Sequence, residues 1–159
     1  MKQSRDSHRF EVVIEIPRGS FLKRGTEGGL DFISPLPCPY NYGAITDYIG
    51  LDGDYLDAIV LGPRASRGET RRTQVRAVIG LTDRGLYDDK VICSDRPLSA
   101  LDRFLLLNFF RTYALFKRLL NFVRAQSGPT HCDGWQDPDA ALDRASPSHG
   151  AKAAPHVGF

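Results

Sequence analysis

The sequence contains no long hydrophobic run and only a small excess of positive charge. Its 159 residues carry 21 lysines and arginines against 19 aspartates and glutamates, a formal net charge of +2. A charge this small does not by itself indicate a nucleic-acid partner. No apolar stretch approaches the roughly 18 residues of a membrane-spanning helix, so we expect no membrane association. With 42% hydrophobic residues, the chain has enough apolar material for the core of one domain.

Cysteine is also scarce. Cys38, Cys93 and Cys132 are an odd number, lie far apart and form no C-x-x-C pair. Small secreted domains use paired cysteines as a disulfide framework, so this pattern fits a reducing compartment better. Residues 1–9 are polar and lack the apolar stretch of a secretory signal. We therefore expect a cytoplasmic location and a flexible arm at residues 1–9.

The strongest feature that is present is a group of three carboxylates within six residues. Asp52, Asp54 and Asp57 follow one another as D-G-D-x-x-D, and the apolar run 58–61 comes directly after them. Such carboxylates repel one another unless a cation lies between them, and Mg²⁺ prefers oxygen ligands of this kind. The apolar run suggests a position at the mouth of a folded core. An acidic β-turn is the alternative, because Asp-Gly also favours hairpins.

A second acidic group favours the metal interpretation. Asp83, Asp88 and Asp89 follow the β-rich run 75–81, and Lys90 comes next. The chain thus presents two strand ends that carry carboxylates, and the second adds a cation. Carboxylates that share metals beside a lysine describe a site for an anionic, phosphate-like ligand.

The pattern of apolar residues predicts a β-rich domain with helices towards its end. Several short β-runs separated by turns indicate a small barrel; they lie at 10–16, 30–33, 44–49, 75–81 and 91–93. From residue 98 to 124 the spacing becomes helical, with Ser99 and Asp102 placed as a capping box. This helix is more apolar than a solvated one, which predicts packing on the barrel and a subunit interface. Residues 146–159 have the composition of a disordered tail.

Taken in order along the chain, these motifs resemble those of the soluble family I inorganic pyrophosphatases, from about residue 10 to 145. The matching segments are Val13–Pro17, Lys23, Tyr40–Gly43, Asp52–Asp57, Thr82–Asp83, Asp88 with Lys90, Phe109–Phe110 with Tyr113, and Gly134–Trp135. The resemblance implies an α+β fold, mainly β: a small closed five-stranded OB-like barrel with one long and one short C-terminal helix. It also implies one domain over residues 10–145 and a homo-oligomer, either a hexamer or a dimer.

The resemblance further implies a function and a set of site residues. The function is Mg²⁺-dependent hydrolysis of inorganic pyrophosphate to two phosphates, with several Mg²⁺ ions in each site. The implied metal ligands are Asp52, Asp57, Asp83 and Asp88, and Asp54 is the implied proton acceptor that orients the attacking water. The implied phosphate contacts are Lys23, Tyr42, Lys90 and Tyr113, with Glu15 supporting water at the edge of the site. From the residues alone, each of three positions has an alternative interpretation: Lys23 as a surface lysine, Glu15 as a strand residue that points outward, and Tyr113 as a residue that packs the helix.

The chain departs from the family pattern where phosphate is bound. The glutamate expected two residues after Lys23 is Gly25, and no arginine occurs between Gly25 and Arg64. Loss of contacts that tighten in the transition state costs orders of magnitude in rate. The alternative function is therefore a catalytically weakened relative that binds metal and phosphate as a regulatory or binding module, or that hydrolyses a different phosphoanhydride.

Two further departures come with neighbouring candidates for compensation. An expected tyrosine is Cys38, and the lysine expected next to Tyr113 is Ala114. Lys117 lies one helical turn beyond Tyr113 and within reach of the same ligand, and Glu27 lies close to the missing glutamate. The sequence leaves open whether either residue replaces a lost group.

Overall fold

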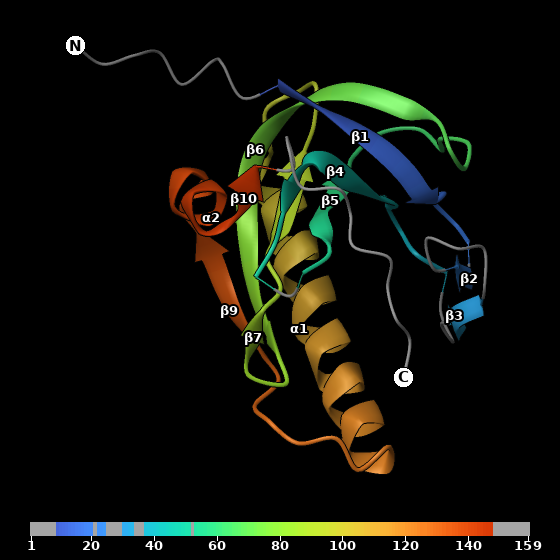
Figure 1. The fold of residues 1–159 in the computed structure, drawn as a ribbon. Helices are drawn as coiled ribbons and strands as arrows, with labels where there is room; N and C mark the ends of the chain where they lie inside the picture. The colour runs from blue at the N-terminus through green and yellow to red at the C-terminus, as the bar shows by residue number, and fades with distance from the viewer. Residues whose placement is uncertain (1–8, 21, 25–29, 34–36, 52, 148–159) are drawn as a thin grey trace.

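The computed structural model describes residues 9–20, 22–24, 30–33, 37–51 and 53–147, and these form a barrel with two helices (Figure 1). The barrel strands are β1 (Arg9–Ile16), β4 (Asn41–Ile49), β5 (Tyr55–Val60), β8 (Lys90–Cys93) and β6 (Thr70–Asp83). They pair in that order, and β6 pairs back with β1 to close the sheet. The β5–β8 pair is parallel and the others are antiparallel. The predicted closed five-stranded barrel is confirmed.

Shorter strands extend this barrel. β7 (Leu86–Tyr87) and β9 (His131–Gln136) pair with β6, and β10 (Ser146–Pro147) pairs with β4. β2 (Leu22–Arg24) and β3 (Leu30–Ile33) form a separate two-stranded sheet. β9 was not predicted from the sequence. β6 is longer than the predicted run 75–81, because it pairs with four partners along its length. β1 begins at residue 9 and β10 consists of residues 146–147. Both therefore extend beyond the predicted domain, residues 10–145.

One hydrophobic cluster fills the interior of the barrel. Leu56, Ala58 and Val60 of β5 alternate with residues that point outward, as the two-residue period of a strand requires. All five barrel strands contribute to the cluster: Val12, Ile14, Ile45, Leu56, Ala58, Val60, Val78, Val91 and Cys93. The short helix α2 (Pro138–Arg144) adds Ala141 and Leu142, so it packs against this core as the predicted short final helix.

The long helix α1 (Ala100–Val123) covers the outer face of the strands. It begins at the predicted capping box: the Asp102 amide donates to Ser99 Oγ at 3.0 Å, and the Ser99 amide donates to Asp102 Oδ2 at 2.9 Å. Leu106, Phe110 and Ala114 form its buried stripe at a four-residue spacing. These three residues and the outward-facing residues of the strands form a second hydrophobic cluster. Polar side chains on the same face of α1 therefore also point towards the strands.

The opposite side of α1 remains apolar and exposed. Phe122 is 81% exposed, and Leu115, Leu119 and Val123 are each more than half exposed. The expected broad apolar surface on this helix is therefore present. No helix in the described part of the chain is both long enough and apolar enough to cross a membrane.

A close approach between strands explains the glycine of the Tyr40–Gly43 motif. Gly43 is paired with Ile14 of β1 and Ala58 of β5. A Cβ atom at Gly43 would lie 2.3 Å from the carbonyl oxygen of Val13, which is closer than real Cβ atoms approach. Glycine at this position lets β4 lie against β1 and fixes the strand that carries Tyr42.

Candidate active site

Three polar side chains meet on the barrel face that α1 covers. β5 and β8 run parallel with Asp57 opposite Lys90, and Ala44 of β4 lies opposite Asp57. Tyr42 is two residues before Ala44, so its side chain points to the same side of the sheet. Ile59, two residues after Asp57, belongs to the cluster under α1. Strand pairing thus places Tyr42, Asp57 and Lys90 at the boundary between barrel and helix.

Lys90 is the centre of this group. Its side chain is 1% exposed, and its ammonium donates to Tyr42 Oη at 3.0 Å, to Asp88 Oδ1 at 2.7 Å and to Asp57 Oδ2. An ammonium has three donors, so all three are engaged. Burial lowers the pKa of Lys90, but the charges of Asp57 and Asp88 outweigh it and raise that pKa well above its ordinary value. The charged lysine therefore holds two carboxylates together.

Tyr42 supplies a neutral hydroxyl beside these charges. The residue is 7% exposed. Burial, together with the negative charge of Asp57, raises the pKa of Tyr42 well above its ordinary value. The phenol therefore stays protonated at neutral pH and keeps its capacity to donate a hydrogen bond.

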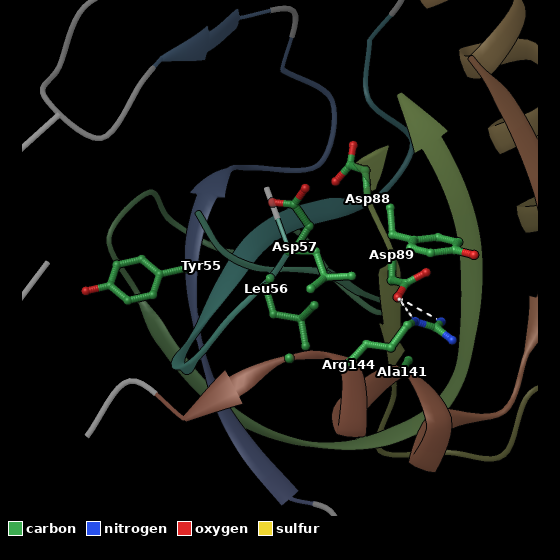
Figure 2. Close-up of a pocket in the computed structure, with 11 residues that line it drawn as sticks. Tyr55, Leu56, Asp57, Asp88, Asp89, Ala141 and Arg144 are labelled. Atoms are coloured by element: carbon green, nitrogen blue, oxygen red, sulfur yellow. Dashed lines mark hydrogen bonds and ion pairs between the residues drawn. The ribbon is translucent and has the colours of Figure 1, made fainter. Parts of the chain in front are cut away.

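The two carboxylates also border a pocket. Figure 2 shows Asp57 and Asp88 next to each other at one side of it, with Asp89 and Arg144 beyond them. The pocket lies between β5, the β7–β8 turn and α2; its lining residues are Gly50, Leu51, Tyr55, Leu56, Asp57, Tyr87, Asp88, Asp89, Ala141, Arg144 and Ala145. The carboxylates are thus bound to Lys90 on one side and accessible from the pocket on the other.

A second ion pair, which the sequence analysis missed, ties α2 to this region. Arg144 donates to Asp89 Oδ2 from Nη2 at 2.9 Å and from Nε at 3.3 Å, and its guanidinium lies 5.1 Å from the ring centroid of Tyr87. Asp89 is 7% exposed, and burial raises its pKa although Arg144 partly opposes the shift. The pair fixes the segment in which Asp88 and Lys90 flank Asp89.

Asp83 lies in a separate polar cluster between β6 and α1. Lys117 donates to Asp83 Oδ2 at 2.7 Å, while Asn121 and Thr130 donate to Oδ1 at 3.0 and 3.3 Å. Burial alone would raise the pKa of Asp83, but these hydrogen bonds outweigh it and lower the pKa below its ordinary value. Both carboxylate oxygens are therefore engaged by side chains of the chain itself. Asn121 lies on the buried stripe of α1, where helical spacing from Ala114 places it.

Tyr113 of α1 lies beside Lys117 and packs against the same hydrophobic cluster as Tyr42. Lys117 Nζ is 5.9 Å from the centroid of the Tyr113 ring, and the ring packs against Phe109 and Phe110. Tyr113 also contributes to raising the pKa values of both Lys90 and Lys117. The phenol is therefore within electrostatic reach of both ammonium groups, and it also has the packing role that the sequence left open.

The other predicted residues lie around this centre. Asp54 is exposed just before β5, and Glu15 occupies the irregularity between Ile14 and Ile16 where β1 meets β4. Lys23 lies in β2, opposite Phe32 of β3. Asp52 and Glu27 lie outside the described residues. The structure thus brings Tyr42, Asp57, Asp88 and Lys90 into direct contact, while the roles predicted for the whole set stay predictions.

The chemistry of the carboxylate group suits a hard divalent cation. Asp57 and Asp88 already share one cation, the ammonium of Lys90, so their oxygens converge. Carboxylate oxygens are the ligands that Mg²⁺ prefers. Within the described residues, which exclude Asp52, no three acidic, histidine or cysteine side chains are grouped closely enough to hold a metal ion.

Comparisons with known proteins agree with the resemblance seen in the motifs. A family model described as inorganic pyrophosphatase matches residues 12–149. The soluble inorganic pyrophosphatase of Oryza sativa subsp. indica is 34% identical over 98 residues, covering 55% of this chain and 46% of that protein. The chain spans about half the length of this and similar curated relatives, 46% and 52%.

Solved structures show the same fold. The inorganic pyrophosphatase from Thermus thermophilus has a TM-score of 0.66 and 26% identity, covering 87% of each chain. The enzyme from Helicobacter pylori has a TM-score of 0.68 and 22% identity, covering 91% of this chain and 93% of that chain. Because these alignments cover 91% and 87% of this chain, the similarity is one of the whole fold and not of a single motif.

Proposed function

Because the chain belongs to the inorganic pyrophosphatase family, we propose that it hydrolyses inorganic pyrophosphate to two phosphates with Mg²⁺ as cofactor. The observation that carries the proposal is the contact of Asp57, Asp88 and Tyr42 with one buried lysine, Lys90, beside an open pocket. Two carboxylates suit a metal, and a lysine with a neutral phenol suits a phosphate. The group thus combines what a metal–pyrophosphate complex needs.

The metal ligands in this proposal are the carboxylates of Asp52, Asp57, Asp83 and Asp88. When bound, Mg²⁺ supplies charge neutralisation for the substrate and lowers the pKa of water. Asp54 is exposed at the start of β5, where its carboxylate can accept a proton from water and orient it. Glu15, at the bulge of β1 beside the strand of Tyr42, supports water at the edge of the site.

The phosphate contacts in this proposal are Lys23, Tyr42, Lys90 and Tyr113. The high pKa of Tyr42 keeps its hydroxyl a donor at neutral pH. The charge of Lys90 offsets the negative charge that accumulates on the departing phosphate. Tyr113 is held by aromatic packing on α1, so its hydroxyl stays at a fixed place relative to both lysines.

We also propose a cytoplasmic homo-oligomer, a hexamer or a dimer. The exposed apolar side of α1, with Leu115, Leu119, Phe122 and Val123, supports self-association because such a surface is costly to leave in water. The three unpaired cysteines support a reducing compartment. Light scattering on the purified protein measures the subunit number directly.

The decisive test is phosphate release from pyrophosphate during a Mg²⁺ titration. We expect release that requires Mg²⁺ and that Asp54→Asn lowers by on the order of a hundredfold or more, since it removes the proton acceptor. The matched control is Asp95→Asn, which removes an exposed carboxylate beyond the far end of β8 and should keep wild-type activity. Wild-type protein that binds Mg²⁺ but releases no phosphate from pyrophosphate would contradict the proposal.

A further inference from the structure

Lys90 and Lys117, whose side chains both point towards the strands, differ in how many of their hydrogen-bond donors are used. The three donors of Lys90 go to Tyr42, Asp57 and Asp88. Lys90 must therefore release one of these partners before it can bind a phosphate oxygen. Among the described residues, the ammonium of Lys117 has a single acceptor, Asp83. Lys117 can bind an anion through its other donors without losing that contact.

Lys117 is also accessible where Lys90 is not. Its side chain is 31% exposed, against 1% for Lys90. Its ammonium is paired with the carboxylate of Asp83 at 2.7 Å, and an opposite charge at this distance favours the charged form of the lysine. Its Nζ also lies 5.9 Å from the ring centroid of Tyr113, so Lys117 borders a residue that is itself a predicted phosphate contact.

The position of Lys117 is fixed by its helix and by its partner. Lys117 follows Ala114 by three residues and precedes Asn121 by four, so it lies on the stripe of α1 that packs on the strands. Asp83 is itself held by Asn121 and Thr130 at 3.0 and 3.3 Å. A carboxylate with both oxygens engaged is a rigid anchor for the ammonium that it holds.

From this arrangement we propose that Lys117 is a substrate-binding residue, whose ammonium donates to a phosphate oxygen of pyrophosphate while Asp83 positions it. The inference deepens the proposed function and rests on it. Asp83 then has a second role besides the predicted metal contact, which is to position Lys117. The ligand is recognised by charge: Lys117 supplies a partly exposed ammonium, and the ring centroid of Tyr113, a predicted phosphate contact, lies 5.9 Å from its Nζ.

The test is calorimetric titration of the Mg²⁺-loaded protein with methylenediphosphonate, a pyrophosphate analogue that is not hydrolysed. We expect Lys117→Met to weaken binding of the analogue by about tenfold to a hundredfold, as for the loss of a hydrogen bond to a charged group. Lys117→Arg retains the charge and should keep most of the affinity. Arg118→Met is the matched control, because it removes one exposed charge from the neighbouring helix position and should leave the affinity unchanged.

The outcomes separate the inference from the proposed function. Thermal unfolding and Mg²⁺ titration of each variant show whether a loss of analogue binding arises from misfolding or from loss of metal. If Lys117→Met is less stable yet binds the analogue like the wild type, Lys117 is only a structural partner of Asp83 and the inference is overturned. If the wild type binds the analogue and releases phosphate while Lys117→Met does both equally well, the inference alone fails. If the wild type does neither, the proposed function fails and the inference with it.

Discussion

The contact of one buried lysine with two carboxylates leads to a prediction about stability that does not depend on activity. Lys90→Met keeps the length of the side chain and removes its charge. Asp57 and Asp88, whose side chains are 19% and 14% exposed, would then face each other without the ammonium of Lys90. We expect the variant to be less stable than the wild type in a metal-free buffer, because two partly buried carboxylates repel each other.

The size of the effect follows from the burial of the ion group. Removal of one partner from a buried salt bridge costs about 3–5 kcal/mol, since it leaves an uncompensated charge. Two carboxylates remain here, and both keep some contact with water, so we expect a value within that range and not above it. Natural domains have a free energy of unfolding of about 5–15 kcal/mol, so the variant should unfold at a much lower urea concentration.

Mg²⁺ should reverse part of this loss. In the variant the two carboxylates are no longer engaged by Lys90, so a divalent cation can take its place. A ligand at about a hundred times its dissociation constant stabilises a folded protein by about 2.7 kcal/mol. We therefore expect Mg²⁺ to stabilise Lys90→Met more than it stabilises the wild type.

The measurement is urea unfolding of both proteins, each with EDTA and with excess Mg²⁺. Arg118→Met, which removes an exposed charge, controls for loss of a positive charge and should change stability by less than about 0.5 kcal/mol. Equal stability of Lys90→Met and wild type in EDTA would refute the ion group as a stabilising element. A destabilised variant that gains nothing extra from Mg²⁺ would instead refute Asp57 and Asp88 as metal ligands.

Four other predictions follow from single contacts. Gly43→Ala should lower the free energy of unfolding by about 1–3 kcal/mol in urea titrations, because its methyl group would overlap a β1 carbonyl; wild-type stability would contradict the strand spacing. Cys93 is fully buried, and burial raises its pKa to about 12, so mass spectrometry after alkylation at pH 8 should find it unmodified until the protein unfolds. Arg144→Met should cost about 3–5 kcal/mol on urea unfolding by leaving buried Asp89 unpaired; an unchanged midpoint would show that α2 is held by apolar contacts alone. Hydrogen bonds from Arg96 and from the Ser99 amide at the α1 N-cap lower the pKa of Asp102, so the stability that its carboxylate contributes is complete above the unfolded pKa of about 3.9 and is lost as the pH falls below that value. In urea titrations Asp102→Asn should therefore have a lower free energy of unfolding than the wild type at pH 7, and the difference should shrink at acidic pH.

The parts of the fold that depend on local sequence could be predicted. The capping box of α1 involves residues only three apart, Ser99 and Asp102, and its chemistry is visible in the sequence. The predicted runs likewise overlap β1, β3, β4, β6 and β8, although β3 lies in the separate sheet and β5 completes the barrel in its place. β9 was missed because its six residues, HCDGWQ, include a glycine and lack β-branched side chains. It is a strand because it pairs with β6, a contact that local propensity does not contain.

The candidate site could be predicted as a set of residue types but not as an arrangement. The contact of Lys90 with Asp57 joins residues 33 apart, and that of Arg144 with Asp89 joins residues 55 apart. Nothing in the sequence states that β5 and β8 are parallel neighbours, which is the fact that brings the first pair together. Asn121 could have been found, because helical spacing from Ala114 places it on the buried stripe where an amide needs a partner.

The packing of α1 explains why a lysine at position 117 suits this chain better than one at position 114. Ala114 is 6% exposed and packs in the apolar cluster under the helix. A lysine there would bury its charge among apolar side chains, which costs several kcal/mol unless an acidic partner is present. One turn further, the stripe leaves the apolar cluster and meets Asp83, which provides that partner at 2.7 Å. A cation that approaches Tyr113 from this helix is therefore stable at position 117, and its location follows from where the apolar contact ends and the acidic strand end begins.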